Sequence, residues 1–418
     1  MKRILIITIC ITISEIGLAQ GQWTKKADFI NVREQAIGFS IGNKGYVGCG
    51  AGYGIADTFN DFWEYNASNN TWAQKANIGV LARIGALSFN IGNKGYVGGG
   101  YIMRRTQGTI DSLYIIAFSD FWEYDVDSNY WTRRADLPTG ARMWGAGFSI
   151  NNSGYITCGK DATGYKNDLW EYKPDSNRWY PKTNFPGSAR SRPVAFAIGN
   201  NGYVGTGFSP TGTSTNKDFW KYDPATNTWN RIKDLDSSRY LAFGFSIGNK
   251  GYVGCGISFT NYYKDFIEYN PDSDVWRQKA NFGNNSNRSS TISFSIGNKG
   301  YVGLGYDSAD TKYKDFWEYA PWSTGVSEIG KTEYFLLHPT LRIYPNPTTG
   351  IFIIEIKAKG KAEITVTDIL GKALYIELSQ KITDNFSKEI NLSGADAGLY
   401  FVKVKVGDKI YTNKIIIQ

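Results

Sequence analysis

The sequence is poor in histidine and cysteine. Among its 418 residues there is one histidine, His338, and the four cysteines form no Cys-x-x-Cys pair. Copper sites depend on imidazole ligands, and Ser-His-Asp or Cys-His catalysis needs a histidine beside the nucleophile. We therefore expect no metal centre, no cofactor and no histidine-dependent catalytic residues.

The cysteines do not form a disulfide framework. Cys10 lies in the N-terminal segment, and Cys49, Cys158 and Cys255 occupy the same place in a repeated phrase described below. Equivalent points of alternate repeats should lie farther apart than the limit of about 7 Å between the Cα atoms of a disulfide. We therefore expect three free, buried thiols that serve as small packing residues.

Concentrated charge of one sign is also absent. The formal net charge is +8, of which +1 lies in residues 1–19 and +3 in residues 340–418, so +4 remains for some 320 residues. Recognition of nucleic acid needs basic residues gathered on one face. The sequence therefore excludes nucleic acid as an expected partner.

The only candidate membrane segment is the first one. Lys2 and Arg3 precede an apolar stretch that Glu15 interrupts, and Gly17 and Ala19 follow at the positions that signal peptidase reads. The stretch is short for a bilayer. We predict a cleaved signal peptide at 1–19 and no transmembrane segment in the mature chain, with a retained anchor as the alternative.

Glycine-rich phrases recur along most of the chain. "GFSIGNKGYVGCG" occupies residues 38–50 and returns unchanged at 244–256, and four variants end at Gly100, Gly159, Gly207 and Gly305. The glycines of the six Gly-Tyr pairs are 48 to 59 residues apart. A period of this length indicates stacked or radially arranged supersecondary units.

Each repeat predicts four short strands. In the first, residues 36–41 alternate small and large side chains, "GNKG" at 42–45 suits a tight hairpin, and residues 46–50 return as a second strand. "DFWEY" at 61–65 forms a third, and a tryptophan seven residues after its tyrosine marks a fourth. Both faces of such a sheet are apolar or glycine-rich, so we expect the sheets to pack face to face and the tryptophans to be core.

The ends of the repeat region predict a closed ring. The sixth repeat lacks a fourth strand after Tyr319, whereas "QWTKKA" at 22–27 matches the fourth-strand phrase "TWAQKA" at 71–76. The glycine pair, the downstream tyrosine and the spaced tryptophan resemble the kelch family of β-propellers, the superfamily of galactose oxidase, over residues 22–319. The resemblance implies an all-β, six-bladed kelch propeller at 20–320, closed by its N-terminal strand. The single histidine argues against the copper chemistry of galactose oxidase.

The composition changes after the repeats. Residues 321–342 read as a linker, and residues 343–418 as a small Ig-like β-sandwich of alternating strands. This part resembles the C-terminal sorting domain (Por) of type IX secretion cargo in Bacteroidetes. The residues that carry the likeness are Tyr344, Pro345, Asn346, Pro347, Gly350, Asp368, Gly371, Gly398, Leu399, Tyr400 and Lys414 to Ile417.

The resemblance to sorting domains implies partners and a location. It implies recognition by the type IX secretion machinery, passage through the outer membrane and removal of the domain. The mature protein would then be extracellular or attached to the outer-membrane surface. An adhesive Ig-like module is the alternative.

One charged residue repeats with the phrase. Twelve residues before each Gly-Tyr glycine stands an arginine: Arg33, Arg83, Arg142, Arg190, Arg239 and Arg288. We expect these residues to begin the innermost strands and to ring one mouth of the central channel. Such arginines either bond neighbouring blades, through carbonyls or aromatic rings, or form an anion-binding funnel, since guanidinium matches carboxylates at two points.

The same mouth should carry the variable loops between second and third strands, of which 101–119 is the longest. Trp144 and Arg192 break the repeat two residues after their arginines, and aromatic residues open several loops. Variable loops on a rigid frame commonly hold binding sites. The ligand-binding candidates are therefore the six arginines together with Trp144, Arg192, Tyr101, Phe208 and Tyr306.

Two main functions fit these patterns. The first is a secreted, non-catalytic propeller that binds a glycan or protein through its loop-rich face. The alternative is a metal-free carbohydrate enzyme, such as a sialic acid mutarotase or epimerase, by resemblance to the kelch-fold mutarotases. In that case an arginine cluster would hold the sugar carboxylate while Glu34, Asp111 or Asp161 moved protons. A purely architectural surface protein is a third possibility.

Overall fold

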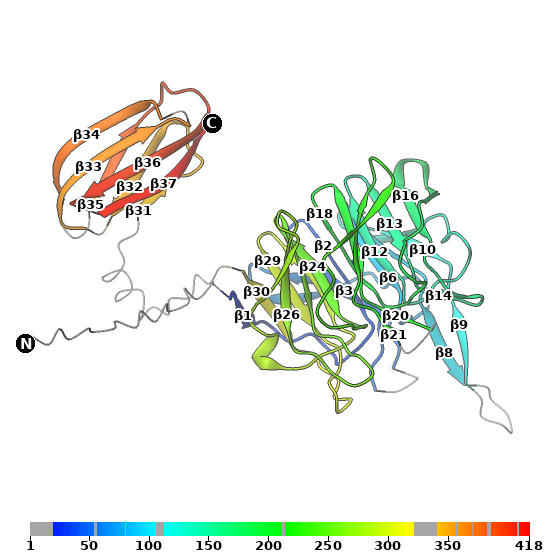
Figure 1. Cartoon of the computed structure of the whole chain (residues 1–418). Helices are drawn as coiled ribbons and strands as arrows, with labels where there is room; N and C mark the ends of the chain where they lie inside the picture. Colours follow the sequence, from blue (N-terminus) through cyan, green and yellow to red (C-terminus); the bar gives the residue numbers. More distant parts are fainter. Residues whose placement is uncertain are drawn as a thin grey trace, which may run out of the picture. The chain divides into compact units, whose positions relative to one another are not determined.

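The computed structural model describes residues 20–53, 57–79, 81–105, 113–210, 214–321, 341–356, 358–369, 371–382, 386–407 and 409–418. Contacts divide the chain into two compact units, Met1–Ser323 and Thr324–Gln418 (Figure 1). The predicted signal peptide, Asp111, His338 and nearly all of the predicted linker lie outside the described residues.

Among its described residues, the first unit contains six four-stranded antiparallel sheets, numbered as blades 1 to 6. Blade 1 comprises β2 (Ile37–Ile41), β3 (Lys44–Gly48), β4 (Phe62–Asn66) and β5 (Thr71–Lys75). Blade 2 comprises β6 (Leu87–Ile91), β7 (Lys94–Gly98), β10 (Phe121–Asp125) and β11 (Tyr130–Arg133). Blade 3 comprises β12 (Ala146–Ile150), β13 (Ser153–Thr157), β16 (Leu169–Lys173) and β17 (Arg178–Lys182).

The remaining blades repeat this order. Blade 4 comprises β18 (Val194–Ile198), β19 (Asn201–Gly205), β22 (Phe219–Asp223) and β23 (Thr228–Ile232). Blade 5 comprises β24 (Phe243–Ile247), β25 (Lys250–Gly254), β26 (Phe266–Asn270) and β27 (Val275–Gln278). Blade 6 comprises β28 (Ile292–Ile296), β29 (Lys299–Gly303), β30 (Phe316–Ala320) and the N-terminal β1 (Gln22–Lys25). Two short 3-10 helices, η1 (Pro174–Ser176) and η2 (Gly283–Asn285), lie between strands.

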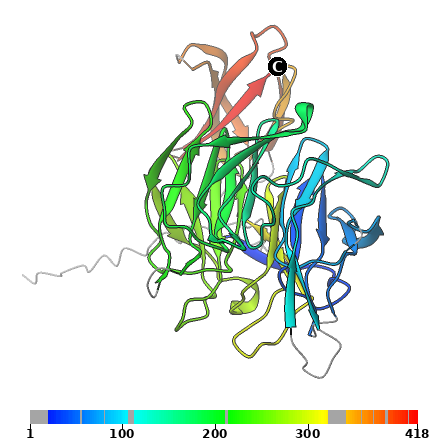
Figure 2. The ribbon, with the colours of Figure 1, turned by 90° about the vertical axis from the view of Figure 1, so that its right-hand side faces the viewer.

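The blades close into a ring. The innermost strands β2, β6, β12, β18, β24 and β28 each contact the next, and β28 contacts β2. Figure 2 shows the ribbon after a turn of 90°, with the blades coloured in chain order. β1 pairs with β30 in antiparallel register, with Trp23 opposite Tyr319. The predicted closure of the last blade by the N-terminal strand is therefore confirmed.

The repeated glycine explains how tightly the blades approach. A Cβ placed on Gly45 would lie 2.2 Å from the Phe294 ring of the neighbouring blade. The glycines of the other five Gly-Tyr pairs meet a phenylalanine ring in the same way: Gly95 meets Phe39, Gly154 meets Phe89, Gly202 meets Phe148, Gly251 meets Phe196 and Gly300 meets Phe245. Only glycine leaves room for these rings.

Tryptophans fasten the outer parts of the blades. Trp72 Nε1 donates to the carbonyl of Ala27 at 3.1 Å, and Trp131 Nε1 donates to that of Ala76 at 2.8 Å. Trp23 Nε1 likewise donates to the carbonyl of Ala280 at 3.0 Å. Each indole ring packs against apolar side chains, and its N–H group has a hydrogen-bond acceptor. These aromatic residues therefore belong to the core, as expected.

Cys49, Cys158 and Cys255, the cysteines that the structure describes, are free and buried. Burial raises the pKa of Cys49 to about 12 and that of Cys158 to about 11, because it disfavours the thiolate. Such thiols are poor nucleophiles and act as small packing residues.

The second unit is a sandwich of two antiparallel sheets. One contains β31 (Leu341–Tyr344), β32 (Ile351–Ile356) and β35 (Phe386–Asn391). The other contains β34 (Ala373–Ile382), β33 (Gly360–Thr367), β36 (Gly398–Val406) and β37 (Lys409–Ile417). Alternate residues of both sheets, such as Ile354, Ile364 and Val402, fill the core between them. Within the described part of the chain, no helix has the length and apolar character needed to cross a membrane.

Candidate functional site

The six repeated arginines lie inside their blades. Arg33 donates from Nη1 to Asp61 Oδ1 at 2.7 Å and from Nη2 to Asp61 Oδ2 at 3.0 Å, and also reaches the carbonyl of Cys49. The other pairs are Arg83–Asp120, Arg142–Asp168, Arg190–Asp218, Arg239–Asp265 and Arg288–Asp315. Each aspartate begins the "DFWEY"-type phrase, so the pair joins the segment before the first strand to the third strand.

This pairing corrects the expected position of the guanidinium groups. At most 1% of the surface of any of the six arginines is exposed, so the groups do not line the channel mouth. Burial opposes ionisation of Asp218, but hydrogen bonds from Arg190 outweigh it and lower the pKa of Asp218. With both charges satisfied internally, the geometry favours the structural interpretation of these arginines over the anion-binding one.

The channel mouth is instead formed by the residues that stand two positions after the repeated arginines in the sequence. Six residues there, one per blade, adopt left-handed backbone with φ between 50° and 62°: Gln35, Gly85, Trp144, Arg192, Leu241 and Ser290. We call this set the mouth ring. Hydrogen bonds join ring neighbours, for example from Trp144 N to the Gly85 carbonyl and from Arg192 N to the Trp144 carbonyl, both at 2.8 Å. These bonds offset the cost of left-handed backbone at residues other than glycine.

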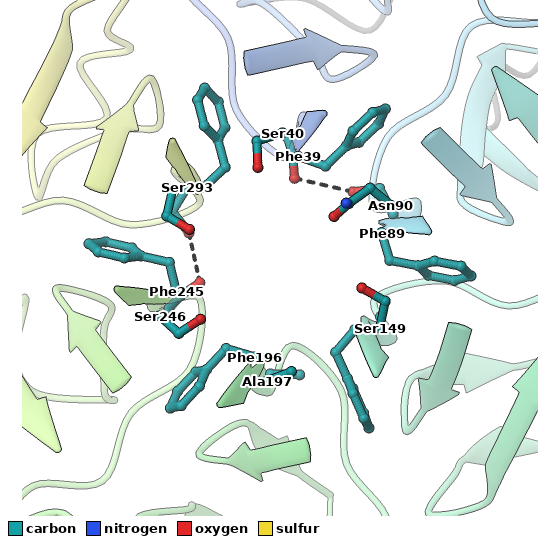
Figure 3. Close-up of a pocket in the computed structure, with 18 residues that line it drawn as sticks. Phe39, Ser40, Phe89, Asn90, Ser149, Phe196, Ala197, Phe245, Ser246 and Ser293 are labelled. Carbon is teal, nitrogen blue, oxygen red and sulfur yellow. Dashed lines mark hydrogen bonds between the residues drawn. The ribbon is translucent and has the colours of Figure 1, made fainter. Parts of the chain in front are cut away.

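The mouth ring encloses a small pocket. The ring residues and the residue after each of them line a cavity of about 120 Å³, called here the mouth pocket. Below it, the channel between the innermost strands has a volume of about 330 Å³. Figure 3 shows Ser40, Asn90 and Ser149 pointing into this channel while the Phe39 and Phe89 rings point away, between the blades. Serine and asparagine side chains thus line the channel in most blades, Ala197 takes the equivalent place in blade 4, and no charged residue is among the lining residues.

Arg192 has an unusual environment in the mouth pocket. Its guanidinium lies 4.1 Å from the centre of the Trp144 ring and 6.0 Å from that of Tyr240. Its Nε is enclosed and has no hydrogen-bond partner. Desolvation lowers the pKa of Arg192, and the groups that act against this effect are tyrosines, Tyr101 and Tyr240 foremost. The site thus holds a cation among aromatic rings.

Trp144 is held in place from three sides. Its Nε1 donates to Gln35 Oε1 at 2.9 Å, and the Tyr101 ring meets it edge-on with centroids 5.1 Å apart. A Cβ on Gly85 would lie 2.6 Å from Trp144 Cδ1, so the glycine makes space for the indole. Tyr101, Trp144 and Arg192, which the sequence singled out separately, are therefore neighbours.

The other predicted residues lie around this centre. Phe208 belongs to an aromatic cluster with Tyr165, Tyr240 and Phe259, at centroid distances of 5.7 to 6.0 Å. Tyr306 pairs through its backbone with Ser289, the residue before ring member Ser290. The sequence analysis missed Tyr240 and Gln35. Tyr240 directly follows one of the repeated arginines, and Gln35 stands two residues after another.

Of the acidic residues considered for proton transfer, the two that the structure describes are engaged. Glu34 forms an ion pair with Lys312. Asp161 pairs with Lys166 and accepts hydrogen bonds from Thr163 in the turn between β14 (Lys160–Asp161) and β15 (Gly164–Tyr165). No group of three or more His, Cys, Asp or Glu side chains within the described ranges is arranged to hold a metal ion.

Loops between the second and third strands surround the mouth ring and expose apolar side chains. In blade 2 they form the hairpin of β8 (Tyr101–Arg105) and β9 (Leu113–Ala117), which extends from the blade in Figure 1. In blade 4 a shorter hairpin pairs β20 (Phe208–Ser209) with β21 (Ser214–Thr215). Tyr53 and Phe259 are 63% and 61% exposed, and Ile115 of β9 is 52% exposed. We call the mouth ring and these loops the mouth face.

In the second unit the predicted motif residues connect its first and last strands. Asn346 Nδ2 donates to the Lys414 carbonyl at 2.9 Å, and Ile416 N donates to Asn346 Oδ1 at 2.9 Å. A Cβ on Gly350 would lie 2.6 Å from Ser393 Cα, and Tyr400 Oη donates to the Asp396 carbonyl at 2.6 Å. Gly398 lies opposite Ile417 in the β36–β37 pair, and Pro345 and Pro347 flank Asn346 after Tyr344.

Comparisons with known proteins match both units. Residues 86–305 match the model of the KLHDC2/KLHL20/DRC7 kelch-repeats domain, and residues 342–418 match that of the secretion system C-terminal sorting domain. A solved structure titled "Structure of YjhT" is 15% identical and aligns over 70% of this chain and 95% of its own, with a TM-score of 0.57. At that identity the likeness concerns the fold alone. No curated protein matches.

Proposed function

Because the chain belongs to the kelch-repeat family and ends in a secretion-system C-terminal sorting domain, we propose that it is a non-catalytic propeller that binds a glycan or protein outside the cell. The mouth face is the proposed binding surface. Tyr101, Trp144, Arg192, Phe208 and Tyr306 are the proposed contact residues.

One observation carries this proposal. The mouth face combines exposed aromatic and aliphatic loop residues, such as Tyr53 and Phe259, with an Arg192–Trp144 pair held at the channel entrance. The rest of each blade is committed to packing through glycines, phenylalanines and tryptophans. Large exposed apolar side chains clustered on one set of loops are typical of interaction sites.

Glycan and protein arrays test the binding function. We expect the purified protein to retain a ligand that the Trp144→Ala variant binds about tenfold more weakly, since the substitution removes an aromatic contact worth roughly 1–1.5 kcal/mol. Tyr101→Ala should also weaken binding, because the buried Tyr101 ring supports the Trp144 indole. Val275→Ala, on the outer strand β27, is the control and should bind normally. Arrays without any ligand, or variants that bind like the wild type, would contradict the proposal.

The export route forms part of the same proposal. A signal peptide at 1–19 would direct the chain to the periplasm, and the sorting domain would engage the type IX secretion machinery and then be removed. In a host with this machinery, a variant lacking residues 342–418 should accumulate in the periplasm. Cell fractionation with immunoblotting measures this, and normal surface delivery of the truncated variant would overturn the route.

The alternative enzyme, a sialic acid mutarotase or epimerase, has less support. It needs a free carboxylate near the sugar, yet of the candidates that the structure describes, Glu34 pairs with Lys312 and Asp161 pairs with Lys166. Proton NMR of anomer exchange in sialic acid, with and without the protein, distinguishes the two. Faster exchange in the presence of the protein would favour the enzyme.

A further inference from the structure

The hairpin of β8 and β9 ends in a free strand edge. At the base of the hairpin, Tyr101 of β8 forms an antiparallel bridge with Ile84, which occupies that edge of β8. β9 pairs with the opposite edge of β8 along its whole length. Among the described strands, β9 has no other hydrogen-bonded neighbour. The main-chain groups along its outer edge can therefore pair with a further strand.

β9 carries none of the residues that commonly protect a strand edge. Its sequence, LYIIA, contains no charged residue and no proline. Charged side chains and proline at an edge oppose pairing with another chain. The outermost strand of each of the six blades carries such residues: Lys25 in β1, Lys75 in β5, Arg133 in β11, Arg178, Pro181 and Lys182 in β17, Arg231 in β23 and Arg277 in β27. The blade edges are thus protected, whereas the edge of β9 is not.

β9 also exposes apolar side chains on both of its faces. Tyr114, Ile115 and Ile116 are 46%, 52% and 40% exposed. Successive side chains of a strand point to opposite faces, so Ile115 lies on one face and Tyr114 and Ile116 lie on the other. Adjacent large apolar side chains in contact with water are typical of a surface that another protein covers.

The order of these residues favours a second copy of this chain as the partner. If two β9 strands pair in antiparallel orientation about a twofold axis at Ile115, the two Ile115 side chains face each other. Each Tyr114 then faces Ile116 of the partner subunit. Pairs of β-branched and aromatic residues are favourable across neighbouring strands. A second copy supplies this complementary order by symmetry, whereas a different chain would have to match it.

Charge does not oppose such a pairing. The exposed Arg104 of β8 lies opposite Tyr114 of its own hairpin. In a sheet of two hairpins the two Arg104 residues would lie on the outer strands, roughly 14 Å apart at about 4.8 Å per strand spacing. At that distance, exposed like charges are largely screened at physiological salt. No charged residue therefore meets a like charge across the shared edge.

We propose that two copies of this chain associate through the outer edges of their β9 strands and form a four-stranded sheet in the order β8, β9, β9, β8. Main-chain hydrogen bonds would join the two β9 strands, and their side chains would fix the register. The association closes after two copies, because each hairpin offers its β9 edge once. This inference does not rest on ligand binding, since none of the proposed contact residues lies on β9.

Sedimentation velocity of the purified protein tests the proposal. Between about 1 and 100 µM, the measured mass should rise toward that of two chains. Ile115→Lys places a charge at the centre of the shared edge, so its mass should stay that of one chain. Val275→Lys places the same charge on the outer strand β27, where Val275 is 39% exposed, and should associate like the wild type.

Both lysine variants should keep the thermal unfolding transition of the wild type, because both positions are exposed. A wild-type protein that remains a single chain at about 100 µM would refute the proposal. The same holds for an Ile115→Lys variant that still doubles its mass, or for a mass that grows beyond two chains.

Cross-linking tests the register. In Ile115→Cys the two introduced thiols would face each other, with Cβ atoms about 4.5–5.5 Å apart. Molecular oxygen would then accept two electrons and two protons from the two thiols as their sulfurs join. Cys49, Cys158 and Cys255 are buried and should not react. The covalent dimer should be at least about tenfold more abundant than from Val275→Cys, because pairing raises the effective concentration of the thiols. Equal yields would contradict the twofold register.

The outcomes separate this inference from the binding function. A dimer that retains no ligand on the arrays would support the pairing of β9 while the proposed function fails. A protein that stays monomeric and binds a ligand, including an extended peptide at the β9 edge, would support the proposed function and refute the second copy as the partner.

Discussion

Arg190 and Arg192 are separated by one residue and have opposite environments. Arg190 is enclosed and holds Asp218 at two points, whereas Arg192 stacks on Trp144 and faces the mouth pocket without an acidic partner. The first residue connects parts of one blade. Arg192 keeps a positive charge without an acidic partner at the mouth face, which is the proposed binding surface.

This contrast gives a stability prediction. Arg190→Gln should lower the free energy of unfolding by about 3–5 kcal/mol, because it leaves the partly buried Asp218 without its counter-ion. Arg192→Gln should change it by less than about 0.5 kcal/mol, since no ion pair is lost. Chemical denaturation of both variants measures the difference. Equal losses would show that Arg192 has a structural role.

At the residue scale, the sequence predicted where the arginines stand but not where their guanidinium groups point. The regular spacing located them before the innermost strands, yet spacing alone does not reveal side-chain direction. Their partner was visible in principle, because every repeat that carries the arginine also carries the aspartate of the "DFWEY"-type phrase. The left-handed backbone of the mouth ring was not foreseeable, since only Gly85 among its members signals positive φ.

At the element scale, the blades depend on a layer of buried tyrosines. Tyr124, Tyr172 and Tyr222, on the third strands of blades 2, 3 and 4, each donate a hydrogen bond to an asparagine in the following turn. Burial raises the pKa of each of these phenols to about 12 from the ordinary value of 10.0. Ionisation of this layer is therefore coupled to opening of the blades.

The layer predicts a sharp loss of stability in alkali. A group whose pKa is higher in the folded than in the unfolded state stabilises the fold fully below the unfolded value, so this contribution is complete below pH 10 and disappears as the pH rises toward 12. Tyrosinate absorbance and circular dichroism, followed together from pH 9 to 12.5, should change in one cooperative step. Ordinary titration of all tyrosines near pH 10, with the fold intact, would contradict the coupling.

The strand pattern itself was predictable from the sequence. Alternation of small and large residues, the "GNKG" hairpins and the spaced tryptophans fixed four strands per repeat, because a strand imposes a period of two and a tight turn selects glycine and asparagine. The short hairpin β14–β15 was not foreseen, since its two-residue strands are too short to carry a pattern.

At the scale of the whole molecule, the ring depends on one short strand. β1 supplies the fourth strand of blade 6, and Trp23 packs against Phe266 and Phe282 of blade 5 and the segment that follows it, with ring centroids 5.0 and 5.1 Å apart. β1 thus fastens the last blade to the rest of the propeller.

Removal of β1 should open the propeller. A variant that starts at Asp28 should lose at least about 3 kcal/mol of unfolding free energy, as expected for the loss of a packed tryptophan together with its strand pairing. Thermal unfolding followed by circular dichroism measures this. A variant that lacks residues 324–418, the second compact unit, should keep the transition of the first unit unchanged. A stable propeller without β1 would show that closure is dispensable.

The mouth ring has a consequence for how this protein could acquire new specificities. Its hydrogen bonds run through the main chain, and the same backbone conformation already accommodates glutamine, glycine, tryptophan, arginine, leucine and serine. Each of the six positions can therefore carry a different side chain without a change in the backbone around it. Exchanging the side chains at these positions would change which ligands the channel mouth selects, while the fold of the propeller would stay the same.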